Sequence, residues 1–419
     1  MSYRDRVAFF CVGDGARTFE RFGVDPWKLL SDRESQELML ALAEGARTLN
    51  ELRELVVPSA LRKLDTLVGY KLVRVVGGAY TASIPVVTDS KALELRAALR
   101  PLAAAVAGVV EDRMSELEST YSRTLMSERF AWSEVAHIVV DALLLDFSML
   151  FCVETLLVRE GLFRGWSEGQ LLIPFFGMEV GPNMVNFGVN SGLLDGFGLS
   201  VMHGSMIRRR IGVSQLMRAL WSERSSLLEL CREGRLEEVP ETLVELGLAR
   251  ASRAGYELAV PVLRDGDKEL VTEVVVAVAH ESAEELVSRY SLIENAFRNL
   301  GYSEWLEGIG DFAELAFHVV MALSVEELVD REALPKIPEE APASWGVWMW
   351  SSPWTLSFKI ICNHMLEELV EIANRRGPRA NVERMIEEAR EMARRGEYRS
   401  ALVRLREAID AYREVDELR

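Results

Sequence analysis

The stretch that decides the fold covers residues 30–87 and reads LSDRESQELMLALAEGARTLNELRELVVPSALRKLDTLVGYKLVRVVGGAYTASIPVV. Residues 30–42, 48–52 and 61–67 have apolar side chains at helical spacing, which predicts three short amphipathic helices. They are followed by two apolar, β-prone runs, Leu72–Val76 and Ala79–Thr81, on either side of a Gly-Gly turn. The sequence therefore predicts three helices that lead into a tight β-hairpin.

This order of elements is that of a winged helix-turn-helix, which places one helix in the major groove of DNA. The third helix is the expected recognition helix, with Leu61, Leu64 and Leu67 on its core face and Pro58 in its first turn. The side chains expected to meet phosphates or base edges are Ser59, Arg62 and Lys63 on this helix and Arg74 on the first strand of the hairpin. A solvated helix face remains an equal alternative for Arg62 and Lys63.

The segment from Leu29 to Tyr80 resembles the winged-helix domain of ArsR/MarR-type prokaryotic regulators, through the pattern LLSD…LMLALAEG…TLNELREL…LRKLDTLVGYKLV…GGAYTAS. The resemblance implies the fold and a role in transcription regulation. Winged helices also serve in protein–protein assemblies and in the dimerisation of enzymes, so the function is implied less firmly than the fold. Metal sensors of the ArsR type carry cysteines in the helix that corresponds to Glu51–Leu55, and this segment has none. We therefore expect neither a metal nor another cofactor.

Four segments of the first half of the chain recur in the second half in the same order. They pair Ser35–Leu42 with Ser214–Leu220, Thr66–Arg74 with Thr242–Arg250, Tyr80–Val87 with Tyr256–Leu263, and Trp132–Leu143 with Phe312–Leu323. Chance produces one such match easily but not four in order. The sequence therefore predicts a mainly α (α+β) protein with tandem duplicated winged helices, each followed by a helical segment.

The expected division of the chain follows from this duplication. It consists of an N-terminal segment (1–29), a first winged helix (30–89), a helical and Gly-rich segment (90–210), a second winged helix (211–265), a helical and Trp-rich segment (266–375) and a hairpin of two helices like a tetratricopeptide repeat (376–419). We call residues 30–89 the first module and residues 211–265 the second module. The long helices after each module could pair within one chain as a pseudo-dimer.

Charge separates the two modules. The chain has a net charge of -17, and an acidic chain binds nucleic acid only through a local basic patch. In the second module the matched helix carries Glu237, Glu238, Glu241 and Glu245, which would repel phosphates. The second module is therefore expected to be structural or to bind protein. The basic cluster Arg208–Arg210 fits equally well a pairing with that acidic helix or a contact with DNA.

Candidate sites for small molecules are few. His137 and His318 lie in matched segments, and Trp345, Trp348, Trp350 and Trp354 gather near residue 350. Aromatic walls suit a flat or apolar effector, so these six residues form the candidate ligand pocket. Backbone-bonded core histidines and an aromatic core plug are the alternatives. No pair of histidines has metal-ligand spacing and no catalytic motif occurs, so we expect no enzyme, although an enzyme that uses winged helices for assembly stays open.

The four cysteines are far apart and the N-terminal apolar run is short, which favours a cytoplasmic protein. The apolar stretch 135–158 carries His137, Asp141, Asp146 and Glu154, which favours a buried helix pair over a membrane span. The leading hypothesis is a regulator that binds double-stranded DNA through the first module and uses the helical segments for ligand sensing or pseudo-dimerisation. The alternative is an adaptor that binds a protein partner through the acidic second module or the C-terminal hairpin, or that forms a homodimer.

Overall fold

The structure is a computed structural model that describes residues 6–11, 18–160, 162, 174–351, 366–367, 369–374 and 380–395, with residues 401, 404, 405, 407, 408 and 411. Over these residues the chain is of mixed α+β structure, as expected. It divides into two compact units, and each unit is assembled from three separate segments. Unit 1 contains Met1–Leu102, Phe163–Val185 and Arg289–Val320, and unit 2 contains Ala103–Leu162, Asn186–Ser288 and Met321–Arg419.

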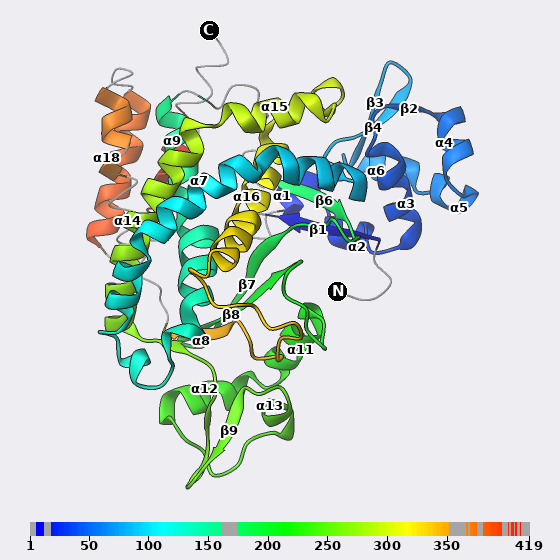
Figure 1. The fold of residues 1–419 in the computed structure, drawn as a ribbon. Coiled ribbons are helices and arrows are strands. Elements are labelled where there is room, and N and C mark those ends of the chain that lie inside the picture. The colour runs from blue at the N-terminus through cyan, green and yellow to red at the C-terminus, as the bar shows by residue number, and fades with distance from the viewer. Residues whose placement is uncertain are drawn as a thin grey trace. The chain divides into compact units, whose positions relative to one another are not determined.

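The first module lies in unit 1 and follows the predicted order of elements (Figure 1). Its elements are α3 (Arg33–Leu42), β2 (Arg47–Thr48), α4 (Leu49–Leu55), α5 (Pro58–Leu61), α6 (Leu64–Gly69), β3 (Val73–Val76) and β4 (Ala79–Ala82). The three strands form an antiparallel sheet in the order β2-β4-β3. The predicted third helix is interrupted at Arg62 and Lys63, which form a turn between α5 and α6.

Local signals explain where these helices begin. Asp32 caps α3 by accepting a hydrogen bond from the Ser35 amide at 2.9 Å. Thr48 and Glu51 form a reciprocal capping box at the start of α4. Gly77 and Gly78 have φ angles of +60° and +85°, which a two-residue turn between right-handed twisted strands requires. The predicted apolar face is buried at Leu38, Leu64 and Leu67, whereas Leu61 is only partly buried.

Unit 1 also contains a three-stranded sheet with β6 (Phe175–Glu179) at its centre. Strand β6 runs antiparallel to β1 (Val7–Cys11) and parallel to β5 (Val86–Val87). The remaining elements of unit 1 are α1 (Thr18–Phe22), α2 (Pro26–Leu29), the start of α7 (Asp89–Tyr121), α15 (Ser291–Asn299), the 3₁₀ turn η4 (Tyr302–Glu304) and the first half of α16 (Gly310–Asp330). Phe175 contacts Phe22 and Trp27 edge-on, so one face of this sheet is packed with aromatic side chains.

Unit 2 is built around apolar helices. They are the second half of α7, the 3₁₀ turn η2 (Leu125–Glu128), α8 (Trp132–His137), the π-helix η3 (Ile138–Met149), α9 (Leu150–Glu160), α14 (Asp265–Ser288) and the end of α16, with α18 (Ala380–Arg394) near the C-terminus. The stretch predicted as a helix pair is instead continuous from α8 to α9. Among the described residues, one helix, Trp132–Leu157, is long and apolar enough to cross a membrane, and most of it is buried within the protein.

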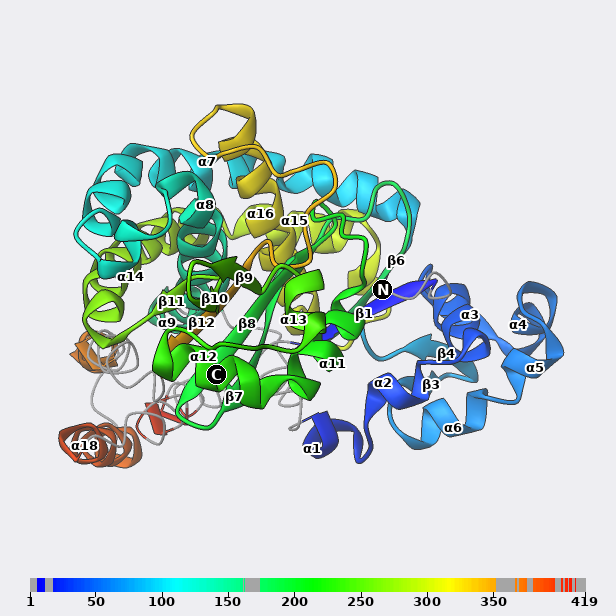
Figure 2. The ribbon, with the colours of Figure 1, turned by 90° about the horizontal axis from the view of Figure 1, so that it is seen from below.

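The sheet of unit 2 has the strand order β11-β12-β8-β7 (Figure 2). Its strands are β7 (Phe187–Leu194), β8 (Phe197–Gly204), β11 (Val262–Leu263) and β12 (Val347–Ser351). Strand β12 runs antiparallel to β8 and parallel to β11. Because side chains alternate along a strand, Val347 and Met349 lie on one face and Trp348 and Trp350 on the other.

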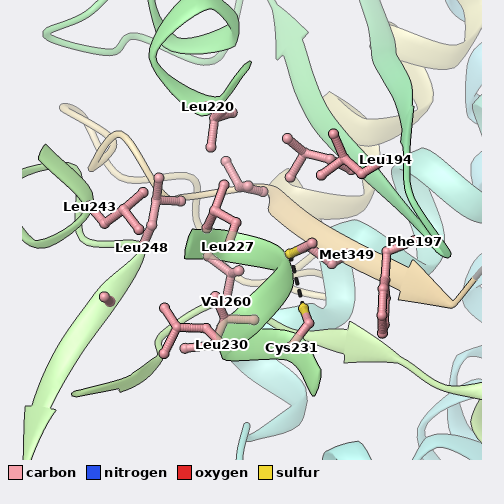
Figure 3. Close-up of a cluster of buried hydrophobic side chains, with 14 of the residues drawn as sticks. Leu194, Phe197, Leu220, Leu227, Leu230, Cys231, Leu243, Leu248, Val260 and Met349 are labelled. Atoms are coloured by element: carbon pink, nitrogen blue, oxygen red, sulfur yellow. Dashed lines mark hydrogen bonds between the residues drawn. The ribbon is translucent and has the colours of Figure 1, made fainter. Parts of the chain in front are cut away.

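The second module packs on the Met349 face of that sheet (Figure 3). Its elements are α11 (Val213–Ser222), α12 (Arg224–Glu233), α13 (Glu241–Glu245), β9 (Ala249–Ser252) and β10 (Gly255–Leu258). The shared core joins Leu227, Leu230 and Cys231 of α12 to Met349, and the Cys231 sulfur lies 3.3 Å from the Met349 sulfur. Between α12 and the β9–β10 hairpin the second module has one short helix, α13. The first module has three helices, α4, α5 and α6, between α3 and its β3–β4 hairpin.

Several backbone hydrogen bonds recur in the two modules at positions 176 residues apart. The amide of Leu72 donates to Leu67 at 2.9 Å, and the amide of Leu248 donates to Leu243 at 2.8 Å. The amide of Ser83 donates to Leu72, and that of Ala259 donates to Leu248. Lys71 and Gly247 occupy the same left-handed conformation, with φ angles of 61° and 70°. The two modules therefore have the same hydrogen-bond pattern at these positions.

Of the predicted C-terminal hairpin, α18 and single helical positions such as Leu405 are described, and the turn at Gly396 lies outside the described residues. The side chain of Arg404 donates to Glu388 of α18 at 2.6 Å. Ala389, Ala401 and Leu405 are buried, as close packing of two helices requires.

Gly255 is expected to tolerate no side chain. Its φ is +115°, and a Cβ atom there would lie 2.2 Å from the carbonyl oxygen of Leu236, which bonds to Tyr256 in a β-bridge. We expect Gly255→Ala to lower the free energy of unfolding by about 3 kcal/mol, from backbone strain and steric overlap together. Gly234→Ala is the matched control, because Gly234 has a φ of +74° with open space around it. Urea unfolding followed by circular dichroism would contradict this if both variants lost the same stability.

Candidate functional site

The outward face of α5 and α6 carries the predicted contacts of the first module. Arg62 is exposed in the turn between the two helices, and Ser59 is partly exposed. Lys63 lies beside them, but its ammonium group is 3.0 Å from the carboxylate of Asp32. Burial alone would raise the pKa of Asp32, yet the hydrogen bonds from Ser35 and Lys63 hold that pKa below its usual value. Arg62 is therefore exposed to solvent on this face, whereas Lys63, which is 40% exposed, is paired with Asp32.

Arg74 is tied into the protein on three sides. Its Nε donates to the Thr81 hydroxyl at 3.2 Å, a terminal nitrogen donates to the carbonyl of Trp305, and the other lies 3.8 Å from the carboxylate of Glu307. The side chain remains 30% exposed. These contacts give Arg74 a role in fixing the hairpin against residues 305–307, beside any contact with a phosphate.

The first module also exposes apolar side chains that the sequence analysis did not single out. Val75 and Val76 at the tip of the hairpin are 50% and 54% exposed, and Leu55 and Val57 between α4 and α5 are 55% and 47% exposed. The signal was present in the sequence as the run Val73–Val76 directly before the Gly-Gly turn. Exposed apolar groups at a hairpin tip are a feature of contact surfaces.

The second module is acidic where the first presents Arg62. Glu241 and Glu245 lie on α13, whereas Glu238 lies before that helix and not on it as predicted, and all three are exposed. Glu237 is exposed as well. This surface would repel a phosphate backbone.

The basic cluster at residues 208–210 pairs elsewhere. Arg210 forms a bidentate pair with Glu340, with distances of 2.7 and 3.1 Å. Arg209 donates to the carbonyl of Trp345 at 2.6 Å, and burial lowers its pKa to about 10. Neither side chain pairs with the acidic helix α13 in the described part of the chain.

The candidate ligand pocket is divided between the two units. In unit 2, His137 lies between the carboxylate of Asp141 at 2.7 Å and the carbonyl of Pro335 at 2.8 Å, and its ring is 5.2 Å from that of Trp345. In unit 1, His318 bonds to the carbonyl of Glu314 at 2.8 Å and contacts Phe176. The structure therefore brings His137 and Trp345 together, and His318 belongs to another site.

The two histidines differ in their protonation. Burial alone would lower the pKa of His137, but the charge and hydrogen bond of Asp141 outweigh it and raise that pKa. The carbonyl of Pro335 can only accept, so the other ring nitrogen and Asp141 share a second proton. Burial lowers the pKa of His318 to about 4, so its ring is neutral at physiological pH.

Of the tryptophans of β12, Trp348 is buried and Trp350 is partly buried. Trp348 is 2% exposed. Trp350 donates to the hydroxyl of Ser200 at 2.9 Å and covers Gly198, where a Cβ atom would lie 2.0 Å from the indole ring. Trp354 lies outside the described residues. A hollow of about 640 Å³ lies elsewhere in unit 2, between the β7–β8 turn at Leu194 and Asp195 and the helices around Trp221 and Arg232.

The His137 and Trp345 pair, the hollow beside Trp221 and the face of α5 and α6 are thus three separate places in the described structure. At the face of α5 and α6, Arg62 is an exposed cation. The chain matches no family model, no curated protein and no solved structure.

Proposed function

We propose that the protein is a DNA-binding regulator whose first module is a winged helix-turn-helix. The proposal is supported by the element order from α3 to β4 and by the sheet order β2-β4-β3, which sets the hairpin beside the helices. In such a fold the helix after the turn enters the major groove and the hairpin lies along the backbone. Here these are α5 with α6 and the β3–β4 hairpin.

The observation that carries the proposal is the charge of the presented surface. Residues 58–74 contain four basic residues, Arg62, Lys63, Lys71 and Arg74, and one acidic residue, Asp65. Residues 234–250 of the second module, which likewise end in the first strand of a hairpin, contain two basic and four acidic residues. A surface under no selection for polyanion binding in a chain of net charge -17 would be expected to resemble the second stretch rather than the first.

Two of these four basic residues, Lys63 and Arg74, already have partners within the protein. The strength of each interaction decides whether the side chain can bind a phosphate instead. A partly exposed ion pair such as Lys63 with Asp32 contributes about 0–1 kcal/mol, so Lys63 can exchange Asp32 for a phosphate at little cost. Arg74 makes three contacts and would lose more. We therefore assign the main phosphate contact to Arg62, a secondary one to Lys63, and the positioning of the hairpin to Arg74.

The second module is, in this proposal, a degenerate copy of the first. The recurring hydrogen bonds from α6 to β4 support the duplication. One of the segment pairs predicted from the sequence, Ser35–Leu42 with Ser214–Leu220, is replaced in this proposal. The bridge of Leu236 with Tyr256 corresponds to the pairing of Arg47 with Tyr80, so α12 rather than α11 takes the place of α3. Leu227 then corresponds to Leu38, and both are fully buried.

The helical segments would provide the regulatory part of the protein. His137 and Trp345 are the members of the candidate ligand pocket that support sensing, because they meet in unit 2. His318, Trp348 and Trp350 take roles in packing, and no double-stranded DNA contact is assigned to any of them.

The test is DNA binding by the Arg62→Glu variant. We expect it to reduce affinity for mixed genomic fragments at least tenfold at low salt, because a phosphate contact is replaced by repulsion, and to lower the slope of log affinity against log salt by about 1. Arg253→Glu is the matched control, since Arg253 is an exposed arginine at the tip of the second hairpin. Equal binding by both variants and the native protein, or no binding at all, would rule the proposal out.

A second candidate function is an adaptor that binds another protein. It is favoured by the exposed Leu55, Val57, Val75 and Val76 on the first module and by the acidic surface of the second. It predicts that a partner stays bound to Arg62→Glu and is released by Val75→Lys with Val76→Lys. Retention of the partner by the double lysine variant would count against it.

A further inference from the structure

Each half of the chain follows one order of elements beyond the modules themselves. In the first repeat (residues 7–179) the order is β1, the first module, β5, α7, η2, the apolar helix α8–η3–α9, and β6. In the second repeat (residues 197–351) it is β8, the second module, β11, α14 with α15, η4, the apolar helix α16, and β12. Every element of the first repeat after its module has a counterpart in the second.

The two sheets repeat the same topology. In each, the last strand of the repeat is central, antiparallel to the first strand and parallel to the short strand after the module. The amide of Gly177 donates to the carbonyl of Pro85 at 2.9 Å, and the amide of Met349 donates to that of Pro261 at 2.9 Å. The short strand pairs with the central strand in the same register in both sheets. In each sheet these strands come from a single repeat.

The apolar helix α8–η3–α9 and the first half of α16 each lie in the unit that contains the sheet of the other repeat. In unit 1 the sheet of the first repeat is covered by residues 289–320 of the second. His318 of α16 contacts Phe176 of β6, and Asp311 accepts the amide hydrogen of Phe175 at 2.9 Å. The hydroxyl of Tyr302 in η4 donates to Val86 of β5 at 3.1 Å.

Unit 2 contains the reverse arrangement. The sheet of the second repeat lies with residues 103–162 of the first. His137 of α8 contacts Trp345, two residues before β12, and η3 packs against α14 of the second repeat and against β7, the strand that lies between the two repeats in sequence and pairs with β8. Asp267 at the start of α14 accepts the amide hydrogens of Leu125 and Met126 in η2, at 2.7 and 3.2 Å. The contact of η2 with α14 thus mirrors that of η4 with β5 and α7, where Lys91 lies over the ring of Tyr302.

We infer that this chain is a single-chain dimer, in which the two repeats have exchanged the apolar helix α8–η3–α9 and the first half of α16, and each repeat is the partner of the other. In a dimer of separate winged-helix subunits, a helical face of one subunit packs on the other subunit. Here the other repeat of the same chain packs on that face. A repeat by itself would leave both its sheet and its apolar helix without cover, so the repeats fold together.

This inference also specifies the DNA site, and in that part it rests on the proposed function. Dimeric winged-helix and helix-turn-helix proteins bind palindromic sites because two identical helices are related by a two-fold axis. Here the second module has Glu241 and Glu245 on α13 and Glu238 shortly before it, whereas the first module presents Arg62 in the turn between α5 and α6. The chain therefore occupies DNA as one copy on a single half-site without dyad symmetry.

Hydrogen–deuterium exchange of the full chain tests the exchange of helices without DNA. We expect His318→Ala, a change in the second repeat, to speed exchange at least several-fold in residues 175–179 of the first repeat and to leave residues 347–351 unchanged. His137→Ala should do the reverse. Tyr302→Phe, which removes one hydroxyl, is the milder variant if His318→Ala does not fold, and its effect should fall on residues 86–87. Effects confined to each variant's own repeat would overturn the inference.

Sedimentation with a duplex then tests the DNA site. One chain per duplex and a footprint of about one helical turn without internal symmetry are the expected result. Two chains on a palindromic footprint would overturn the single-chain dimer even where DNA is bound. Absence of DNA binding would instead remove the proposed function, while the deuterium experiment would still decide the arrangement of the helices.

Discussion

Asp311→Ala is expected to lower the free energy of unfolding by about 3–5 kcal/mol, the range for removing one partner of a buried ion pair. Asp311 is fully buried, and its two oxygens accept from the two terminal nitrogens of Arg21 at 2.7 and 2.5 Å. It also accepts the amide hydrogen of Phe175. The Arg21 side chain is only 10% exposed, so the variant leaves a guanidinium and a backbone amide largely cut off from water.

Urea unfolding followed by circular dichroism measures this loss. Asp311→Asn is the matched variant, because it keeps the shape and one acceptor and should lose less than the alanine variant. The double variant Arg21→Met with Asp311→Leu should recover much of the stability, since apolar residues often replace a buried ion pair without loss. A loss below about 1 kcal/mol for Asp311→Ala would show that this pair is better solvated than its geometry indicates.

Asp146→Asn is expected to stabilise the protein by roughly 4 kcal/mol at pH 8 and by only about 1 kcal/mol at pH 4.5. Burial in the π-helix η3 raises the pKa of Asp146 to about 7, although the Val189 amide donates to it. Between the unfolded value of 3.8 and about 7, the folded state holds a proton that the unfolded state has released. Stability therefore falls as pH rises through this window, and asparagine removes that loss.

The measurement is the free energy of unfolding of both proteins between pH 4.5 and 8.5. The native protein should lose more stability than the variant as pH rises from 4.5 to 7, and the difference should level off above pH 8. His318 affects both proteins equally and in the opposite direction. Because burial lowers its pKa from 6.5 to about 4, the free energy of unfolding decreases as pH falls below 6.5. Parallel pH profiles for the two proteins would refute the role given to Asp146.

The first module was predictable because its signals are local. Capping residues, apolar spacing and the Gly-Gly turn each act within a few residues, so Asp32, Thr48 and Gly77 define their elements in any context. The break of the third helix at Arg62 and Lys63 was not predicted. Nor was the engagement of Arg74, because its partners Trp305 and Glu307 lie more than 200 residues away in the chain.

The sites were predictable only in part. Charge at positions 62 and 238 follows from the residues themselves, and the structure exposes both. The meeting of His137 with Trp345, and the separation of both from His318, depend on which unit receives each helix. The spacing of apolar residues along the sequence does not indicate in which unit each helix packs.

By itself, then, the sequence determined the mixed α+β character of the chain and the elements of the first module, and it pointed to a second stretch of the same pattern. Only the tertiary structure decided which sheet each apolar helix contacts, and hence that Asp311 of α16 accepts a hydrogen bond from Phe175 in the sheet of β6. The physical reason is that an apolar helix face gains the same free energy on either of two similar sheets. The periodicity that predicts the helix cannot distinguish its partners, and this choice rests on long-range packing and on the lengths of the connecting segments.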